Sequence, residues 1–119
     1  MYQLNDLLYL MQRLRDPQTG CPWDLKQNFA SIVPHTLEEA YEVADAIERN
    51  DFEQLPGELG DLLFQVVYYS QLATEEGRFG FVEVVDSITR KLLRGTSAHP
   101  TAARPARVGP RPASTCGAG

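Results

Sequence analysis

Two pairs of carboxylates, spaced alike in two helix-forming segments, constrain this chain more than any other feature of its sequence. Glu39 and Glu42 stand three residues apart, and so do Glu58 and Asp61. Side chains at positions i and i+3 lie on one face of a helix. If the two helices pack together, four like charges meet and repel unless a cation lies between them. Hard divalent cations such as Mg²⁺ prefer carboxylate oxygens, so the sequence predicts a metal site between two helices.

A run of acidic residues on a helix is more often a solvated face, and three observations favour a site here. Apolar residues follow each pair by one turn, Val43 after Glu39 and Leu62 after Glu58, so both pairs border a core. The two helices are joined by a short loop, which makes them antiparallel neighbours. Few basic residues stand nearby, since Arg49 lies at the far end of its helix. An unpaired charge at the edge of a core is costly, and a bound Mg²⁺ would remove that cost.

Length, charge and cysteine content narrow the class of protein. The 119 residues allow one domain, and no apolar run approaches the roughly 18 residues that span a membrane. Residues 1–94 hold all 16 acidic residues but only 8 of the 11 basic ones, so their net charge is −8. Such a body is unsuited to nonspecific binding of nucleic acid. The first residues show no secretory signal, and two distant cysteines make no disulfide framework, so we expect a cytoplasmic protein.

Apolar residues at helical spacing predict an all-α fold of four helices, arranged as a bundle that assembles into a dimer or higher oligomer. The helices are expected near residues 4–14, 36–50, 55–76 and 81–94, with a loop over 16–35. Thr36 would cap the second helix in a capping box with Glu39. Its inward side is expected to consist of Leu37, Ala40, Tyr41, Ala44 and Ile47. The third helix is apolar nearly all round, which indicates a central helix or a subunit contact.

Residues 95–119 differ in character from the preceding domain, residues 1–94. They contain no aromatic residue and consist mainly of Pro, Ala, Gly, Arg, Ser and Thr. Such a segment buries too little apolar surface to offset the entropy of ordering it, so we expect a disordered tail. The abrupt change suggests a shifted reading frame or a truncation.

The acidic pairs belong to a longer pattern. Glu38-Glu39-x-x-Glu42 is followed, after 15 residues, by Glu58-x-x-Asp61. This pattern is similar to the EExxE…ExxD signature of the all-α nucleoside triphosphate pyrophosphohydrolases. Other segments extend the resemblance, over about residues 3–94, to the N-terminal domain of the MazG proteins. They are Leu14-Arg15-Asp16-Pro17, Gly20-Cys21-Pro22-Trp23-Asp24, Gln27, Thr36-Leu37-Glu38-Glu39-Ala40-Tyr41-Glu42-Val43, Asp45-Ala46-Ile47 and Glu58-Leu59-Gly60-Asp61-Leu62-Leu63.

The resemblance implies hydrolysis of a nucleoside triphosphate to the monophosphate and pyrophosphate with Mg²⁺, for which Mn²⁺ could substitute. Metal ligands would be Glu39, Glu42, Glu58 and Asp61. Glu38 would orient the attacking water or support the ligands, and Glu39 is the second catalytic candidate. The chemistry suits the residues, because a metal held by carboxylates clamps triphosphate oxygens and lowers the pKa of bound water.

Four residues are candidates for contacts with the triphosphate substrate. Lys91 and Arg94 share one helix face and match phosphate, although cations in a last turn also simply suit the helix dipole. Trp23 could stack on a base, but a lone Trp in a Pro-containing loop is more often a packing anchor. Gln27 is a weaker candidate. Cys21 is rejected as a nucleophile, since no histidine is placed beside it by a motif.

Two other functions remain open at this point. The chain could be a catalytically weak helical module for dimerisation or regulation within a MazG-like protein. It could also be a related pyrophosphatase with a narrow preference, such as for dUTP or dCTP. The preferred base depends on loop geometry that the sequence does not reveal.

Overall fold

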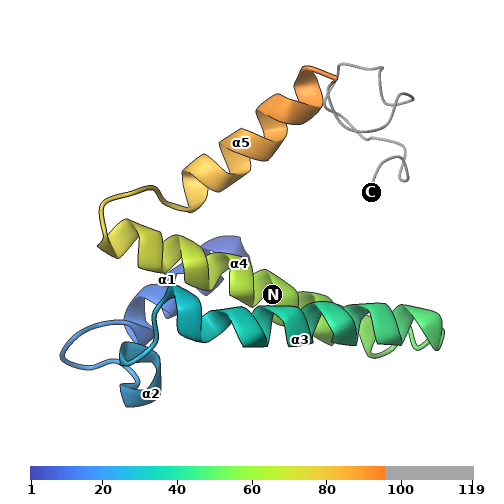
Figure 1. The fold of residues 1–119 in the computed structure, drawn as a ribbon, viewed down its shortest axis with the longest axis horizontal. Coiled ribbons are helices and arrows are strands. Elements are labelled where there is room, and N and C mark those ends of the chain that lie inside the picture. Colours follow the sequence, from blue (N-terminus) through green and yellow to red (C-terminus); the bar gives the residue numbers. More distant parts are fainter. Residues whose placement is uncertain (96–119) are drawn as a thin grey trace. The chain divides into compact units, whose positions relative to one another are not determined.

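The computed structural model describes residues 1–95, which contain five α-helices and no strand (Figure 1). The all-α prediction is confirmed, with one short helix more than expected. The helices are α1 (Leu4–Leu14), α2 (Pro22–Leu25), α3 (Phe29–Glu48), α4 (Leu55–Glu75) and α5 (Phe81–Leu93). The predicted tail lies outside the described residues, apart from Gly95. None of the described helices is long and apolar enough to cross a membrane.

Helix α3 begins seven residues before the predicted start, so the prediction of Thr36 as its N-cap was wrong. Asn28 caps the helix, because its side-chain oxygen accepts a hydrogen bond from the Ser31 N–H at 2.9 Å. The Ser31 hydroxyl in turn accepts from the Asn28 N–H at 2.9 Å, which completes a capping box. Pro34 lies in the second turn of α3, where it removes one backbone donor without ending the helix.

Helices α3 and α4 form an antiparallel pair, and α1 packs on α4 (Figure 1). Phe29 at the start of α3 stacks on Tyr69 near the end of α4, with ring centroids 5.9 Å apart and nearly parallel planes. Residues 1–80 form one compact unit. Its buried side chains include Met11 in α1, Ile32 and Ala46 in α3, and Val67, Tyr68 and Leu72 in α4. The core is therefore built mainly around the C-terminal half of α4.

The side of α3 that faces α4 differs from the predicted one. The covered residues are Ile32, Thr36, Glu39, Val43 and Ala46, at helical spacing. The residues expected to face inward are exposed instead: Leu37, Ala40, Tyr41, Ala44 and Ile47. This helix has two sides rich in apolar residues, and periodicity alone does not tell which one a neighbouring helix covers. Because Thr36 and Glu39 on the covered side are polar, this side was not recognised from the sequence as the one that packs on α4.

Helix α5 belongs to a second unit that begins at Phe81 and is described by itself. It is amphipathic, with apolar residues at helical spacing and an ion pair of 2.8 Å between Asp86 and Arg90. Lys91 lies in its last turn, and Arg94 follows its end.

Candidate metal centre

The antiparallel packing of α3 against α4 brings three carboxylates together. Glu39 of α3 and Glu58 and Asp61 of α4 each offer an oxygen, and these oxygens lie within 4.8 Å of one another. Glu39 and Glu58 are partly buried, while Asp61 is exposed. We refer to these three residues as the acidic cluster. Three of the four carboxylates of the two predicted pairs thus come together across the helix pair.

The electrostatics of the acidic cluster are those of mutually repelling groups. Burial raises the pKa of the Glu39 carboxyl above its ordinary value, and the charge of Asp61 raises it further. Burial likewise raises the pKa of Glu58, followed by the charge of Glu42, whereas Arg49 lowers it. Among the described residues, no ion pair includes a member of the acidic cluster. The local charge is thus not neutralised by a basic side chain.

The donor set of the acidic cluster fits a hard divalent cation. All three side chains offer oxygen, with no thiol or imidazole among them, and Mg²⁺ and Mn²⁺ prefer oxygen ligands. Mg²⁺ is usually held by one or two carboxylates together with water and substrate phosphate. Three converging carboxylates supply enough protein ligands for this arrangement.

Two other acidic residues of the predicted site lie beside the acidic cluster rather than in it. Glu42 stands one turn after Glu39 on α3, is exposed, and does not join the group of three. Its charge nevertheless contributes to the raised pKa of Glu58 and, less strongly, of Glu39. Glu38 is exposed, and its charge also raises the pKa of Glu39. The ligand role of Glu42 and the catalytic role of Glu38 stay predictions.

A small polar network adjoins the acidic cluster between the same two helices. Thr36 stands three residues before Glu39, and Gln65 stands four after Asp61. The Thr36 hydroxyl donates to the Gln65 side-chain oxygen at 2.9 Å. The Tyr69 hydroxyl lies 2.6 Å from the same Thr36 oxygen. Because a threonine hydroxyl carries one proton, Tyr69 is the donor in that second bond when Thr36 donates to Gln65.

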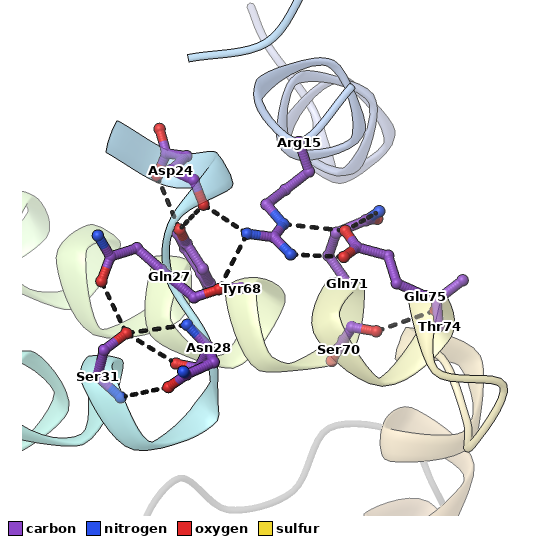
Figure 2. A network of polar contacts seen from close by, with 10 residues as sticks. All are labelled: Arg15, Asp24, Gln27, Asn28, Ser31, Tyr68, Ser70, Gln71, Thr74 and Glu75. Atoms are coloured by element: carbon purple, nitrogen blue, oxygen red, sulfur yellow. Dashed lines mark hydrogen bonds and ion pairs between the residues drawn. The ribbon is translucent and has the colours of Figure 1, made fainter. Parts of the chain in front are cut away.

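The segment between α1 and α3, which contains α2, is fixed to α1 and α4 by a second polar network (Figure 2). The Arg15 guanidinium pairs with Glu75 at 2.5 Å and donates to the main-chain oxygens of Asp24 and Gln27. The Tyr68 hydroxyl donates to the Asp24 carboxylate at 2.9 Å. Tyr68 is 1% exposed and Asp24 7% exposed, so both are core residues. Burial, followed by the bond to Asp24, strongly raises the pKa of the Tyr68 hydroxyl.

Two predicted substrate contacts, Trp23 in α2 and Gln27 just after it, belong to this segment. The Trp23 ring is half exposed and meets His35 of α3 edge to face, with centroids 5.8 Å apart. His35 stands one turn before Glu39, which brings an accessible aromatic surface close to the acidic cluster along the helix. The Gln27 amide donates to the Trp23 main-chain oxygen at 2.9 Å and accepts from the Ser31 hydroxyl at 2.7 Å. This amide thus orders the loop, and a substrate contact by Gln27 stays a prediction.

The contacts of some residues that shape the site were not predicted from the sequence, although Arg15 and Asp24 belong to the segments that carry the family resemblance. Arg15, Asp24 and Tyr68 connect elements through contacts up to 60 residues apart, and no local pattern reports such contacts. Gln65 was not predicted to take part in the site. A polar residue within the apolar strip of α4 is the signal that could have identified it. Lys91 and Arg94 belong to the second unit, and their predicted role stays a prediction.

The fold and the acidic cluster together indicate the class of protein to which this chain belongs. It is an all-α protein in which oxygen donors from two antiparallel helices converge on one point. The sequence matches the MazG nucleotide pyrophosphohydrolase domain over residues 27–98. The chain belongs to this family, and the resemblance inferred from its motifs is confirmed.

Similar proteins from several bacteria carry names that agree with this family. A nucleoside triphosphate pyrophosphohydrolase of Escherichia coli is 63% identical over 94 residues, which are 79% of this chain and 36% of that protein. The nucleoside triphosphate pyrophosphohydrolase/pyrophosphatase MazG of Thermotoga maritima is 40% identical over 89 residues, 75% of this chain and 34% of its own length. A nucleoside triphosphate pyrophosphohydrolase of Mycobacterium tuberculosis is 37% identical over 92 residues, 76% of this chain and 27% of its own length. The chain thus spans about a third of these relatives.

Proposed function

We propose that this chain is a catalytic domain that hydrolyses nucleoside triphosphates to nucleoside monophosphates and pyrophosphate with the help of Mg²⁺. The observation that carries the proposal is the acidic cluster, three carboxylates within 4.8 Å on two helices of a MazG domain. The names of the relatives support the same reaction. In this reaction water attacks the α-phosphorus, the bond to the bridging oxygen breaks, and pyrophosphate leaves.

The proposed roles follow from where each residue lies. Glu39, Glu58 and Asp61 would hold the ion, and Glu42, one turn along α3, would complete or support that ligand set. The bound ion would supply charge neutralisation for the triphosphate and a lower pKa for water. Glu38, next to the cluster and exposed, is proposed to orient the attacking water.

The remaining contacts are proposed for the ends of the substrate. Trp23 offers an accessible ring for a base, one turn of α3 from the acidic cluster through its contact with His35. Lys91 and Arg94 are proposed to bind phosphate oxygens, with Gln27 as a further contact. A cytoplasmic location, where such substrates are abundant, remains part of the proposal.

The experiment that tests the proposal is an assay of pyrophosphate release. The protein is incubated with a panel of ribo- and deoxyribonucleoside triphosphates and Mg²⁺, beside a Glu58→Gln variant that keeps the side-chain shape and removes one charge. We expect release that depends on Mg²⁺ and falls by about a hundredfold or more in the variant, because changes at residues that only support metal ligands already cost about 10- to 100-fold. Release equal in both proteins would contradict the assignment of the acidic cluster.

The alternative functions give different results in the same assay. A dimerisation or regulatory module would release no pyrophosphate above the variant with any nucleotide. A base-selective enzyme would act on one member of the panel, such as dUTP or dCTP, much faster than on the rest. The acidic cluster favours catalysis over the module, because a purely structural role gives no benefit from its repulsion.

A second copy of the chain is the proposed partner. The exposed apolar side of α3 includes Leu37 and Tyr41, and that of α4 includes Leu59 and Leu63. On each helix these exposed residues lie away from the covered ones, so a second copy of the chain would bury apolar surface that the helix pair leaves open. Analytical ultracentrifugation should find a dimer or larger species, and Leu63→Asp should shift it to a monomer. A wild-type monomer would exclude this partner.

A further inference from the structure

The polar network of Thr36, Gln65 and Tyr69 holds an unused donor next to the acidic cluster. Gln65 is 7% exposed, and its side-chain oxygen is engaged by the Thr36 hydroxyl at 2.9 Å. The amide nitrogen of Gln65 carries two N–H groups, and within residues 1–95 no hydrogen bond from it is formed. A buried polar group without a partner costs about 1–3 kcal/mol, so such a group in a native fold calls for an explanation.

The direction of the side chains brings this donor toward the acidic cluster. Side chains on an α-helix lean toward the N-terminus of their own helix. Gln65 therefore leans toward the turn that carries Asp61, and Glu39 leans toward the turn that carries Thr36. Because α3 and α4 are antiparallel, these two preferred directions point toward each other, although no hydrogen bond joins Gln65 to Glu39 among the described residues. The buried Gln65 donor thus belongs to a residue one turn along α4 from Asp61, and the Thr36 that holds its side chain lies one turn along α3 from Glu39.

We propose that Gln65 is a positioning residue of the metal centre, whose amide N–H groups orient the Glu39 carboxylate toward the ion. Thr36 fixes the amide by holding its oxygen, which leaves the nitrogen side for the acidic cluster, and Tyr69 fixes Thr36. Ligand carboxylates in metal sites are generally hydrogen-bonded by neighbours in this way. The inference rests on the proposed function, since it requires that the acidic cluster binds a divalent cation.

The test measures the affinity for Mn²⁺ alone, by calorimetry and by the electron paramagnetic resonance signal of free Mn²⁺, without nucleotide. Gln65→Met removes the amide and keeps the length of the side chain, and Thr36 can still donate to the Ile32 main-chain oxygen at 3.3 Å. We expect a 10- to 100-fold weaker affinity at an undiminished melting temperature. Gln71→Met, on the same helix but bonded to Glu75, is the matched control and should bind Mn²⁺ as the wild type does.

Each outcome decides the question. A Gln65→Met affinity within about twofold of the wild type would overturn the role of Gln65 and leave the metal centre intact. Absence of Mn²⁺ binding by the wild type would overturn the metal centre and this inference with it. If Gln65→Met does not fold, Thr36→Val decides instead, since it releases the amide and keeps the shape of residue 36. Weaker Mn²⁺ binding by Thr36→Val supports the proposal, and unchanged binding overturns it.

Discussion

Replacement of Tyr68 by Phe should destabilise the protein through the loss of one buried hydrogen bond. The aromatic ring is kept in Tyr68→Phe, so its edge-to-face packing on Phe64, with ring centroids 5.6 Å apart, is also kept. The hydroxyl is what changes: it donates to the Asp24 carboxylate at 2.9 Å, where both residues are buried. In Tyr68→Phe this carboxylate keeps no other side-chain donor among the described residues.

The expected magnitude follows from the charge and burial of the acceptor. A hydrogen bond to a charged group contributes about 1.5–3 kcal/mol, and its loss leaves a buried acceptor without a partner. We therefore expect the free energy of unfolding to fall by about 2–3 kcal/mol, which corresponds to about 10–15 °C in the melting temperature of a domain of this size. Tyr69→Phe is the matched control, since that hydroxyl bonds to the neutral Thr36, and it should cost only about 1 kcal/mol.

The assay follows urea unfolding with two probes. Trp23 is the only Trp of the chain and precedes Asp24, so its fluorescence reports on the loop, while circular dichroism reports on the helices. In the wild type we expect coincident transitions, and in Tyr68→Phe an earlier fluorescence transition. In an Asp24→Ala background the Tyr68 change should cost much less. A cost no greater than that of Tyr69→Phe would refute the reasoning.

Three further predictions concern the ion pair, the acidic cluster and a crowded glycine. Arg15→Met should cost about 3 kcal/mol and Glu75→Gln only about 1 kcal/mol in urea unfolding, because the first change also removes donors to two loop carbonyls. In metal-free buffer, Glu39→Gln should be more stable than the wild type near pH 7 and lose this advantage as the pH falls to the ordinary pKa of a glutamate carboxyl. The reason is that the pKa of Glu39 is raised in the folded protein, so folding favours its protonated form. The wild type therefore loses stability as the pH rises through the raised pKa, whereas the side chain introduced by Glu39→Gln carries no titrating group. Gly20→Ala should lower stability by about 2–3 kcal/mol, since a Cβ there would lie 2.6 Å from the main-chain oxygen of Asp16.

One control variant and two contradicting outcomes test these three predictions. Gly60→Ala meets no atom within 4 Å and lies inside α4, so it should stabilise the protein by about 1 kcal/mol. Equal effects of Arg15→Met and Glu75→Gln would mean that the loop carbonyls contribute nothing. A pH-independent difference between the wild type and Glu39→Gln in thermal melts would contradict the repulsion inferred for the acidic cluster.

Local patterns in the sequence predict some helix boundaries and miss others for physical reasons. The boundaries of α1 agree with periodicity because Pro17 and Gly20 follow it directly. The start of α3 was placed late because Pro34 and Thr36 look like a helix start, while Asn28 provides the actual cap. A proline in the second turn removes only one hydrogen bond, which the rest of a 20-residue helix easily offsets.

The site was predictable to the extent that it depends on helix spacing. Glu39, Glu58 and Asp61 come together because each lies on the face where α3 meets α4. Glu42 is rotated about 60° from Glu39 around the helix, which takes it toward the exposed edge of that face. Contacts between distant elements, such as Arg15 with Glu75, depend on how whole helices pack, so no short sequence pattern predicts them.

The position of Arg15 has a consequence for how parts of the protein open. One guanidinium, 10% exposed at its side chain, joins the end of α1, the loop before α3 and the last turn of α4. Loops usually exchange their amide hydrogens through small local openings, well before the helices around them. Here the loop cannot separate without also disrupting the contact between the ends of two helices. Native-state hydrogen exchange should therefore find bonded loop amides, such as those of Gly20 and Cys21, opening together with α1 in one cooperative unit.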